Sequence, residues 1–382
     1  MAQKRESSSY KLHMQDNRSL SLWEKLGVPV ALGKALVNLV YAFLFGWLKP
    51  KEKRSTKYYR HVAFTAMRTL LVNTTARQQH FLAEPTDDAY LKSAKKNGFE
   101  PQTLYLKDGT AAHWIGDPKA SRLIVNFHGG GYVFPAAPEM FTYMYTLLTH
   151  LNSSSSQKAS CLFLSYDLAP SSPYPRQLTQ AAHLLSHILT TLRISPSNIL
   201  LTGDSAGANL VTALLSHITH PHPSPSIPRI NLHGEKLLGA LLISPWIQFT
   251  FTHASIKKNE YKDCVSPPAA SMWSTAFLAS PHPHTSNSDY YNQPSTAPPS
   301  FFTGWPVSNL LIVGGEEEVL IDSITEFAEK LKEGLKGGTE VEFFVAKGEY
   351  HDQMNLDPQI GYAEGCQQGE MIWSWTAERF AV

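Results

Sequence analysis

From residue 103 onward, short apolar runs rich in β-branched and aromatic residues alternate with longer stretches of helical periodicity. The spacing of hydrophobic and polar positions predicts one helix over residues 176–193 and another over residues 323–335. The apolar runs predict eight strands, at residues 103–107, 111–115, 123–127, 161–165, 198–203, 237–244, 309–313 and 341–346. Because most of these strands are almost continuously apolar and are separated by helices, we expect an α/β fold with a mostly parallel sheet covered on both faces.

The first hundred residues have a different pattern, which predicts helices. Residues 57–72 carry apolar side chains at helical spacing. Residues 28–48 form the first long apolar run, which as a helix would rise about 31 Å, roughly the thickness of a bilayer core. Lys34 and Asn38 weaken a spanning interpretation, whereas the basic residues 49–54 can bind anionic headgroups. The run is therefore either a membrane-associating segment or a lid helix packed over a pocket.

These patterns divide the chain into an N-terminal helical part, residues 1–100, and a larger α/β domain, residues 101–382. A long insertion at about residues 250–305 lies between two sheet strands and is rich in aromatic residues. Insertions of this length inside compact domains are usually lids or disordered segments, and the aromatic content favours a lid. Surface loops are predicted where Ser, Pro and His accumulate, at residues 153–156, 220–229 and 281–300.

Composition narrows the class of protein. The 382 residues are 43% hydrophobic and 17% charged, and a formal net charge of +1 gives no reason to expect a nucleic-acid partner. The three cysteines, Cys161, Cys264 and Cys366, match no disulfide framework or zinc pattern and suit a reducing compartment, and Cys161 lies in a predicted strand as a core residue. Residues 1–27 are polar rather than a cleavable secretory signal, so we expect an intracellular protein, cytoplasmic or membrane-associated.

The first candidate for chemistry is Gly203-Asp204-Ser205-Ala206-Gly207, which fits G-x-S-x-G between a predicted strand and a predicted helix. In that context the pattern marks a serine nucleophile. The glycines permit a strained turn that lifts the Ser205 hydroxyl above the sheet edge. A serine N-cap flanked by turn glycines has the same pattern, so this interpretation needs partner residues.

A glycine loop supplies the first partner. The stretch HGGGY directly follows a predicted strand, and Gly129, Gly130 and Gly131 leave their backbone N–H groups uncovered by side chains. Two of these groups, with the N–H of Ala206, can hold the oxyanion of a tetrahedral intermediate. We interpret His128 as a structural residue that braces this loop, not as a base.

These motifs resemble those of the hormone-sensitive-lipase family of α/β-hydrolases, over roughly residues 100–380. Besides HGGGY and GDSAGAN, residues 165–175 are similar to the family's Y-R-L-A-P segment, with Asp167 in place of the arginine. LISPW (242–246) and DCVS (263–266) fall where members carry comparable segments. The resemblance implies a lid made of the N-terminal helices and the long insertion. The opening region resembles filamentous-fungal members, some of which serve secondary metabolism.

The resemblance also implies a triad in the order serine, acid, histidine, with the histidine in a loop after the last strand. A hydroxyl is a poor nucleophile until a neighbouring base removes its proton. Of the 16 histidines, only His351 follows the strand at residues 341–346, so we assign it as the base. Because His351 must be neutral to act, hydrolysis is expected to rise with pH through roughly 6–7.

The triad acid comes from the stretch GGEEEVLIDS, which follows the strand at residues 309–313. Its candidates are Glu316, Glu317, Glu318 and Asp322. In the family an acid, often aspartate, precedes x-L-x-D, which places Glu318 in that role. Ser323-x-x-Glu326 resembles a capping box, which would give Asp322 a structural task beside a helix N-terminus. We therefore favour Glu318, with Asp322 as the alternative acid.

Together these residues predict a serine hydrolase that cleaves a carboxylic ester through an acyl-enzyme on Ser205, with no metal or organic cofactor implied. An acyltransferase or cyclising enzyme would use the same acyl-enzyme with another nucleophile. A non-catalytic binding protein is a third interpretation, because the plant gibberellin receptors resemble this family but lack the base. Tyr132, Phe134, Trp246 and the aromatic residues of the insertion suggest an apolar small-molecule substrate.

Overall fold

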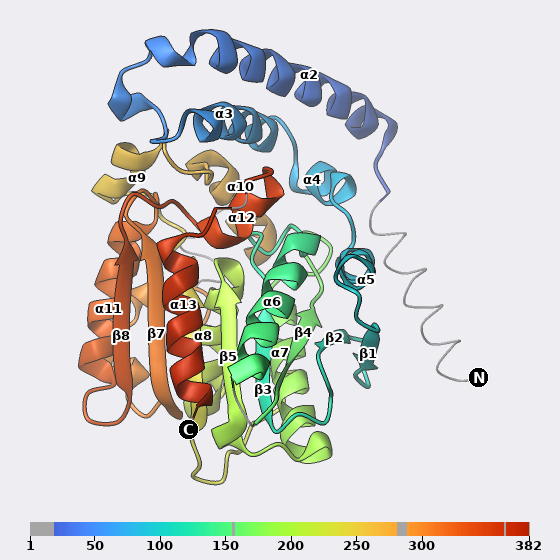
Figure 1. Ribbon diagram of the computed structural model, residues 1–382, viewed down its shortest axis with the longest axis vertical. Coiled ribbons are helices and arrows are strands. Elements are labelled where there is room, and N and C mark those ends of the chain that lie inside the picture. Colours follow the sequence, from blue (N-terminus) through green and yellow to red (C-terminus); the bar gives the residue numbers. More distant parts are fainter. Residues whose placement is uncertain (1–18, 155–156, 281–288, 363, 382) are drawn as a thin grey trace.

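One eight-stranded sheet forms the centre of the computed structural model, which describes residues 19–154, 157–280, 289–362 and 364–381 (Figure 1). The strands are β1 (Gln102–Tyr105), β2 (Ala111–Ile115), β3 (Arg122–Phe127), β4 (Ala159–Ser165), β5 (Ile199–Asp204), β6 (Leu237–Ile243), β7 (Val307–Gly315) and β8 (Glu340–Ala346). Their order is β1-β2-β4-β3-β5-β6-β7-β8, antiparallel from β1 to β4 and parallel beyond. All eight predicted strands and the α/β fold are therefore confirmed.

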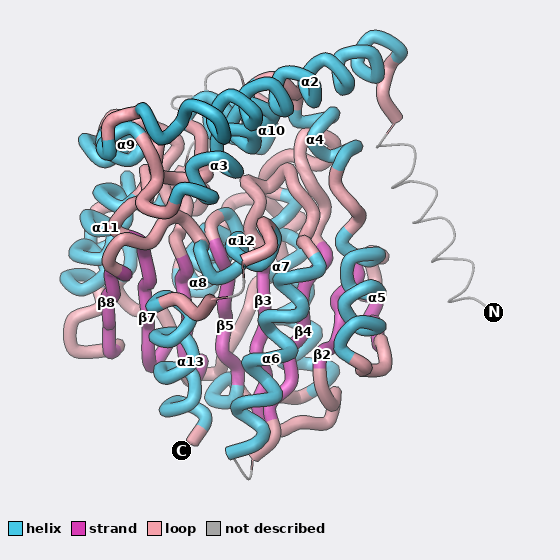
Figure 2. Tube along the Cα trace, turned by 45° about the horizontal axis from the view of Figure 1, so that its top comes forward, coloured by secondary structure: helices cyan, strands magenta, loops and turns pink. Residues whose placement is uncertain are grey.

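Helices cover both faces of this sheet, and a further group lies over one end (Figures 1 and 2). The helices are α2 (Leu22–Phe45), α3 (Tyr58–Val72), α4 (Ala76–Leu82), α5 (Thr86–Asn97), α6 (Pro138–Ser154), α7 (Arg176–His187), α8 (Ala206–Thr219), α9 (Ala254–Asn259), α10 (Pro267–Leu278), α11 (Ile321–Gly334), α12 (Gln353–Gln359) and α13 (Gln367–Phe380). Consecutive strand residues face opposite layers: Leu200 packs with α6 and α13, and Leu201 with α7, α8 and α11.

The helices α2, α3, α4 and α10 lie above the carboxyl ends of the parallel strands (Figures 1 and 2). The helix predicted at residues 57–72 is α3. The apolar run at residues 28–48 lies in α2 up to Phe45 and then in a 3₁₀ helix, Gly46–Leu48. The α2 helix begins earlier than the run because Ser21 and Glu24 form a capping box. A buried ion pair of 2.7 Å between Arg60 on α3 and Asp357 on α12 ties these N-terminal helices to the α/β domain.

Some local predictions need correction. The α11 helix begins at Ile321, so Ser323 lies inside it and donates its hydroxyl to the carbonyl oxygen of Leu320 instead of forming a capping box. The helix predicted over residues 176–193 is α-helical only as far as His187, where α7 ends, and a short π-helix follows over Ile188–Leu192. Parts of two predicted loops, residues 155–156 and 281–288, lie outside the described residues.

Candidate active site

Ser205 occupies the sharp turn between β5 and α8. Its backbone has φ 51° and ψ −114°, a strained conformation for a residue with a side chain, at a cost of about 1–3 kcal/mol. The flanking glycines are needed because the backbone packs so closely here: a Cβ on Gly207 would lie 1.9 Å from the carbonyl oxygen of Phe127, and one on Gly203 would lie 2.4 Å from Gly207. The turn therefore holds the Ser205 hydroxyl at the end of β5, as the motif predicts.

The Ser205 hydroxyl meets an imidazole. His351 Nε2 lies 2.9 Å from Ser205 Oγ, and His351 Nδ1 lies 3.0 Å from Glu318 Oε2. Because a carboxylate only accepts, Nδ1 donates its proton to Glu318 and leaves Nε2 free to accept the serine proton. The structure thus places the three residues assigned from sequence in one hydrogen-bonded chain.

Glu318 is completely buried and is held from two sides. Its Oε1 accepts the hydroxyl of Ser244 and the amide of Gly315, both at 2.5 Å. Asp322, the alternative acid, instead accepts the amide of Ser255 at 2.8 Å, and no contact with His351 is found for it in the described part of the chain. The geometry therefore favours Glu318 as the partner of the histidine.

The pKa of His351 is shifted by its surroundings. Burial alone would lower it, but the hydrogen bond and charge of Glu318, with the charges of Asp263 and Asp204, raise the pKa above its ordinary value of 6.5. Since only the neutral imidazole accepts a proton, kcat/KM should fall as the pH drops through this raised pKa. We expect the acidic limb of kcat/KM to lie above pH 6.5, measured on an uncharged ester from about pH 5 to 9. A limb at or below the ordinary value would contradict the arrangement.

The glycine loop lies beside the serine. Gly130 and Gly131, with φ 102° and 60°, line the cavity next to Ser205. Gly129 has a different neighbour, because its amide hydrogen-bonds the carboxyl group of Asp204. Ala206 is the first residue of α8, so its amide has no partner within the helix. Gly130, Gly131 and Ala206 are therefore better placed to meet an oxyanion than Gly129.

His128 has the structural place expected of it. Its Nδ1 donates to the carbonyl oxygen of Gly129 at 2.7 Å, and its ring stacks on Tyr166 with the centroids 4.2 Å apart. Burial lowers the pKa of His128 to about 4, so the ring is neutral. His128 fixes the start of the glycine loop and lies apart from the hydrogen bonds of Ser205.

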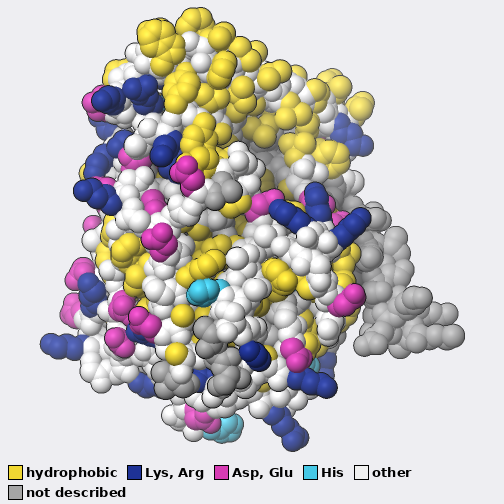
Figure 3. All heavy atoms as spheres, in the orientation of Figure 1, with side chains coloured by type: hydrophobic (Ala, Val, Ile, Leu, Met, Phe, Trp, Pro, Cys, Tyr) yellow, Lys and Arg dark blue, Asp and Glu magenta, His cyan; other side chains and the backbone are white. Residues whose placement is uncertain are grey.

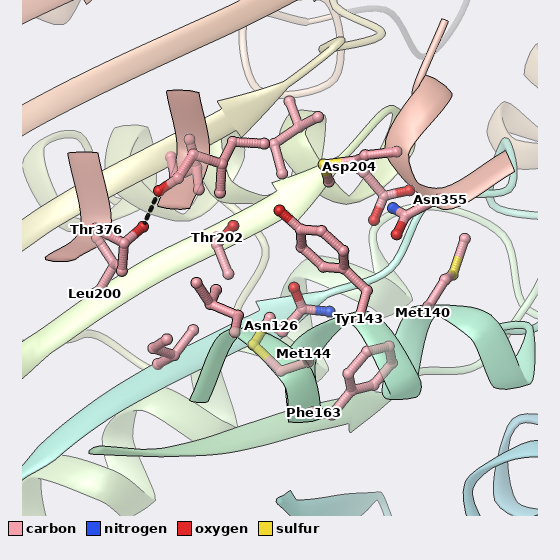
Figure 4. A pocket seen from close by; sticks show the side chains of 16 residues that line it. Asn126, Met140, Tyr143, Met144, Phe163, Leu200, Thr202, Asp204, Asn355 and Thr376 are labelled. Atoms are coloured by element: carbon pink, nitrogen blue, oxygen red, sulfur yellow. Dashed lines mark hydrogen bonds between the residues drawn. The ribbon is translucent and has the colours of Figure 1, made fainter. Parts of the chain in front are cut away.

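Two buried acids that the sequence analysis gave no role lie next to the nucleophile and the base. Asp204 and Asp352 are hydrogen-bonded to each other, and burial raises the pKa of Asp204 to about 6 and that of Asp352 well above its ordinary value. Each carboxyl group thus resists ionisation, because water is excluded from both. Figure 4 shows the Asp204 carboxyl beside the amide of Asn355, which donates to both carboxyl oxygens of Asp352. The contact between Asp204 and Asp352 joins the turn that carries Ser205 to the loop that carries His351.

Asp263 and Ser244 were also missed, although both lie in segments that carry the family resemblance. Asp263 accepts the amides of His351 at 3.3 Å and of Val319 at 2.7 Å. It therefore holds the loop of His351 beside the loop of Glu318. Ser244 contacts both loops as well, since its hydroxyl donates to Glu318 and accepts the Asp352 amide. Only the DCVS and LISPW motifs could have signalled these roles.

A cavity of about 430 Å³ opens in front of Ser205 and His351. Its walls come from the helices α3 and α10, the glycine loop and the segment after β6. The side chains on these walls are mostly apolar, among them Met67, Leu70, Leu71, Phe134, Trp246, Val265, Trp273 and Leu356. Of the insertion's aromatic residues, only Trp273 belongs to this lining, whereas Phe277, Phe302 and Trp305 pack in the core. Tyr132 is also buried away from it, with its hydroxyl on Asn209.

A serine on a strand-to-helix turn, with a carboxylate-bound histidine and a glycine loop, defines an α/β-hydrolase site. Sequence comparison agrees: a family profile described as alpha/beta hydrolase fold matches residues 124–355, and the chain belongs to that family. The chain is 27% identical over 217 residues to an esterase of Acinetobacter venetianus, covering 56% of this chain and 62% of the esterase. It is 31% identical over 134 residues to human hormone-sensitive lipase, which covers 34% of this chain and 11% of the lipase. The chain thus spans less than two thirds of either relative.

Solved structures agree on the fold. An esterase from the bacterial hormone-sensitive lipase family superposes with a TM-score of 0.58 at 23% identity, covering 82% of this chain and 97% of that one. At this identity the superposition supports the architecture alone, so the chemistry of this chain depends on its own site.

Proposed function

We propose that this chain is a carboxylic ester hydrolase that works through Ser205, His351 and Glu318. The observation that carries the proposal is the unbroken chain of hydrogen bonds from Glu318 to His351 to Ser205, which ends at an apolar cavity of about 430 Å³. The esterase and lipase relatives support ester hydrolysis as the reaction class.

The mechanism follows from the contacts. The Ser205 oxygen attacks the ester carbonyl while its proton passes to His351 Nε2, and Glu318 stabilises the imidazolium that forms. The amides of Gly130, Gly131 and Ala206 stabilise the oxyanion, each donor contributing about 3–4 kcal/mol. His351 then protonates the leaving alcohol. Water activated by His351 attacks the acyl-enzyme, and the acid leaves as the Ser205 hydroxyl is restored.

The substrate is an uncharged, largely apolar ester, because the cavity walls offer few groups that could pair with a charge. From the resemblance of the opening region to filamentous-fungal proteins, we further infer a small-molecule ester of secondary metabolism. A panel of p-nitrophenyl esters of increasing chain length tests the first statement, and turnover of charged esters at equal rates would contradict it.

Phe134 limits the length of the acyl chain, because it lines the cavity beside Trp273 with the ring centroids 5.8 Å apart. We expect Phe134→Ala to raise the ratio of kcat/KM for octanoate over butyrate by about tenfold, since the larger cavity holds additional methylene groups. Phe301→Ala removes an equal volume from a ring that packs on His220 away from the cavity, and should leave the ratio unchanged. An unchanged ratio in Phe134→Ala would place the acyl chain elsewhere.

Acyl transfer is a second candidate, favoured by the apolar walls around the acyl-enzyme, which limit access of water. Product analysis in the presence of a competing alcohol separates the two reactions, because a transferase forms the new ester in preference to the free acid. A purely binding role is tested with an organophosphonate, which should label Ser205 if the hydroxyl is activated.

A further inference from the structure

The helix α2 presents an unusually apolar outer surface. More than half of the large hydrophobic side chains exposed in the described chain belong to residues 22–48, including Trp23 at 82% and Trp47 at 60% exposure. Figure 3 shows them as a continuous hydrophobic band along the top of the molecule. By length and composition alone, Leu22–Leu48 is apolar enough to cross a membrane. A patch of this extent on a soluble surface marks an interaction site.

Several polar groups of α2 form hydrogen bonds within the protein, although the side chains of Lys34 and Asn38 are exposed. Lys34 donates to the side chain of Asn73 at the end of α3, at 2.9 Å. Gln78 on α4 donates to the carbonyl oxygen of Glu24 at 2.7 Å. The side chain of Asn38 forms its hydrogen bond within α2, where it donates to the carbonyl oxygen of Lys34. Lys34, which weakens a spanning helix, thus binds α2 to the end of α3, whereas Asn38 satisfies a carbonyl oxygen of α2 itself.

Small residues let α2 pack closely on the helix beneath it. Ala31, Ala35 and Ala42 are buried on the side of α2 that packs on α3. At the end of the helix, a Cβ on Gly46 would lie 2.8 Å from the ring of His61. A helix that crosses a bilayer would have to leave this surface and expose both Lys34 and α3. The packing therefore favours a helix that stays on the body of the protein with only its outer side available.

Positive charge adjoins one end of the hydrophobic band. Lys49, Lys51, Lys53 and Arg54 follow α2 directly, with Glu52 as the single acid among them, and Lys51 and Lys53 are exposed. Basic residues beside an apolar helix bind anionic headgroups, while tryptophan favours the interface between headgroups and acyl chains. This combination fits an anionic lipid surface better than a second copy of the chain, because the headgroups supply the negative charge that the basic segment attracts, whereas the same segment of a second copy has Glu52 as its single acid.

We propose that the outer side of α2 docks in the plane of an anionic lipid bilayer. The helix then lies along the membrane surface with its apolar side chains among the acyl chains and residues 49–54 at the headgroups. The α3 helix lies between this surface and the cavity, which Met67, Leu70 and Leu71 of α3 line. One further step rests on the proposed esterase function: the apolar ester then reaches Ser205 from the lipid phase. The docking of α2 on the bilayer does not depend on that function.

The test is flotation of the full chain with vesicles of phosphatidylcholine, with and without phosphatidylserine. We expect the chain to float with the anionic vesicles and less with the neutral ones. The variant carrying Val30→Glu, Val37→Glu and Leu44→Glu should lose binding by about tenfold or more, because three charges then enter the lipid-facing side. Its turnover of a short water-soluble ester should equal that of the wild type, which shows that the fold is retained. Absence of flotation by the wild-type chain would overturn the proposal.

A matched control carries Leu91→Glu, Tyr105→Glu and Val345→Glu, three exposed apolar residues away from α2, and should float as the wild type does. Loss of binding in this control as well would mean that added charge alone prevents binding, which would also overturn the role of α2. Ser205→Ala should float normally, so a failure of the esterase assignment leaves the docking result intact.

Orientation is tested with a membrane-impermeant thiol reagent on the Cys366→Ser background. Lys25→Cys and Lys51→Cys mark the two ends of α2, and in vesicle-bound protein both should be labelled from outside. Labelling of one end only would show a spanning helix instead. A homodimer in solution that protects both positions without lipid would assign the surface to a second copy. Either result would overturn in-plane docking.

Discussion

Ser205→Ala is expected to lower kcat for ester hydrolysis by about 10⁶-fold, because the proposed acyl-enzyme forms on the Ser205 oxygen. The Ser205 hydroxyl lies 2.9 Å from His351 Nε2, and the alanine methyl group removes both the attacking oxygen and the proton that the imidazole accepts. KM should change little, since the walls of the cavity are untouched. Hydrolysis of a short p-nitrophenyl ester measures the loss, with the wild type assayed at the same pH.

Ser216→Ala is the matched control, because this serine lies on the same helix and its buried hydroxyl has no hydrogen-bond partner in the described part of the chain. It should retain wild-type kcat and react with an organophosphonate at the wild-type rate, whereas Ser205→Ala should not react. Comparable turnover in Ser205→Ala and the wild type would remove the serine from the mechanism, and labelling of another residue would identify its replacement.

The sequence predicted the sheet and the turn that holds Ser205 well because both depend on local patterns. Most of the strands are short, nearly continuously apolar and followed by a helix, so their positions can be recognised without knowledge of their neighbours. The turn of Ser205 is similar, since a Cβ on Gly203 or on Gly207 would lie only 2.4 or 1.9 Å from a backbone atom, so both positions require glycine. His351 could be found because a single histidine follows the last strand.

The acid and its supports were harder to predict because tertiary contacts decide them. Three consecutive glutamates follow β7, and only the fold shows that Glu318 turns inward while Glu317 pairs with Lys262. The contact between Asp204 and Asp352 joins positions far apart in the sequence, and neither residue has a local signature. The predicted capping box at Ser323 was wrong for a related reason. The α11 helix begins at Ile321, so Ser323 lies inside its first turn and donates its hydroxyl to the carbonyl oxygen of Leu320.

The apolar run at residues 28–48 shows the same limit. Sequence alone left a membrane-associating segment and a lid helix as alternatives, since hydropathy does not say which side of a helix packs on protein. In the structure α2 packs on α3 through its alanines, α3 and not α2 lines the described cavity, and the large apolar side chains of α2 are exposed. The separation of small and large residues around the helix becomes clear only once α3 is in place.

Glu318→Gln is expected to lower kcat by about 10⁴-fold, because it forces the imidazole into the wrong tautomer. Two donors, the hydroxyl of Ser244 and the amide of Gly315, meet Oε1 and would hold the oxygen of the new amide there. The NH2 group must then face His351 Nδ1, which becomes an acceptor. The proton moves to Nε2, where it blocks transfer from Ser205.

Asp322→Asn is the matched comparison, since asparagine can still accept the amide of Ser255 that Asp322 binds at 2.8 Å. We expect its kcat to stay within about threefold of the wild type, because Asp322 is half-buried, lies away from His351, and the substitution keeps its hydrogen bond. Circular dichroism and melting temperature check that Glu318→Gln, at a fully buried position, still folds. A larger loss in Asp322→Asn than in a folded Glu318→Gln would transfer the acid role to Asp322, and the orientation of His351 would then need a different explanation.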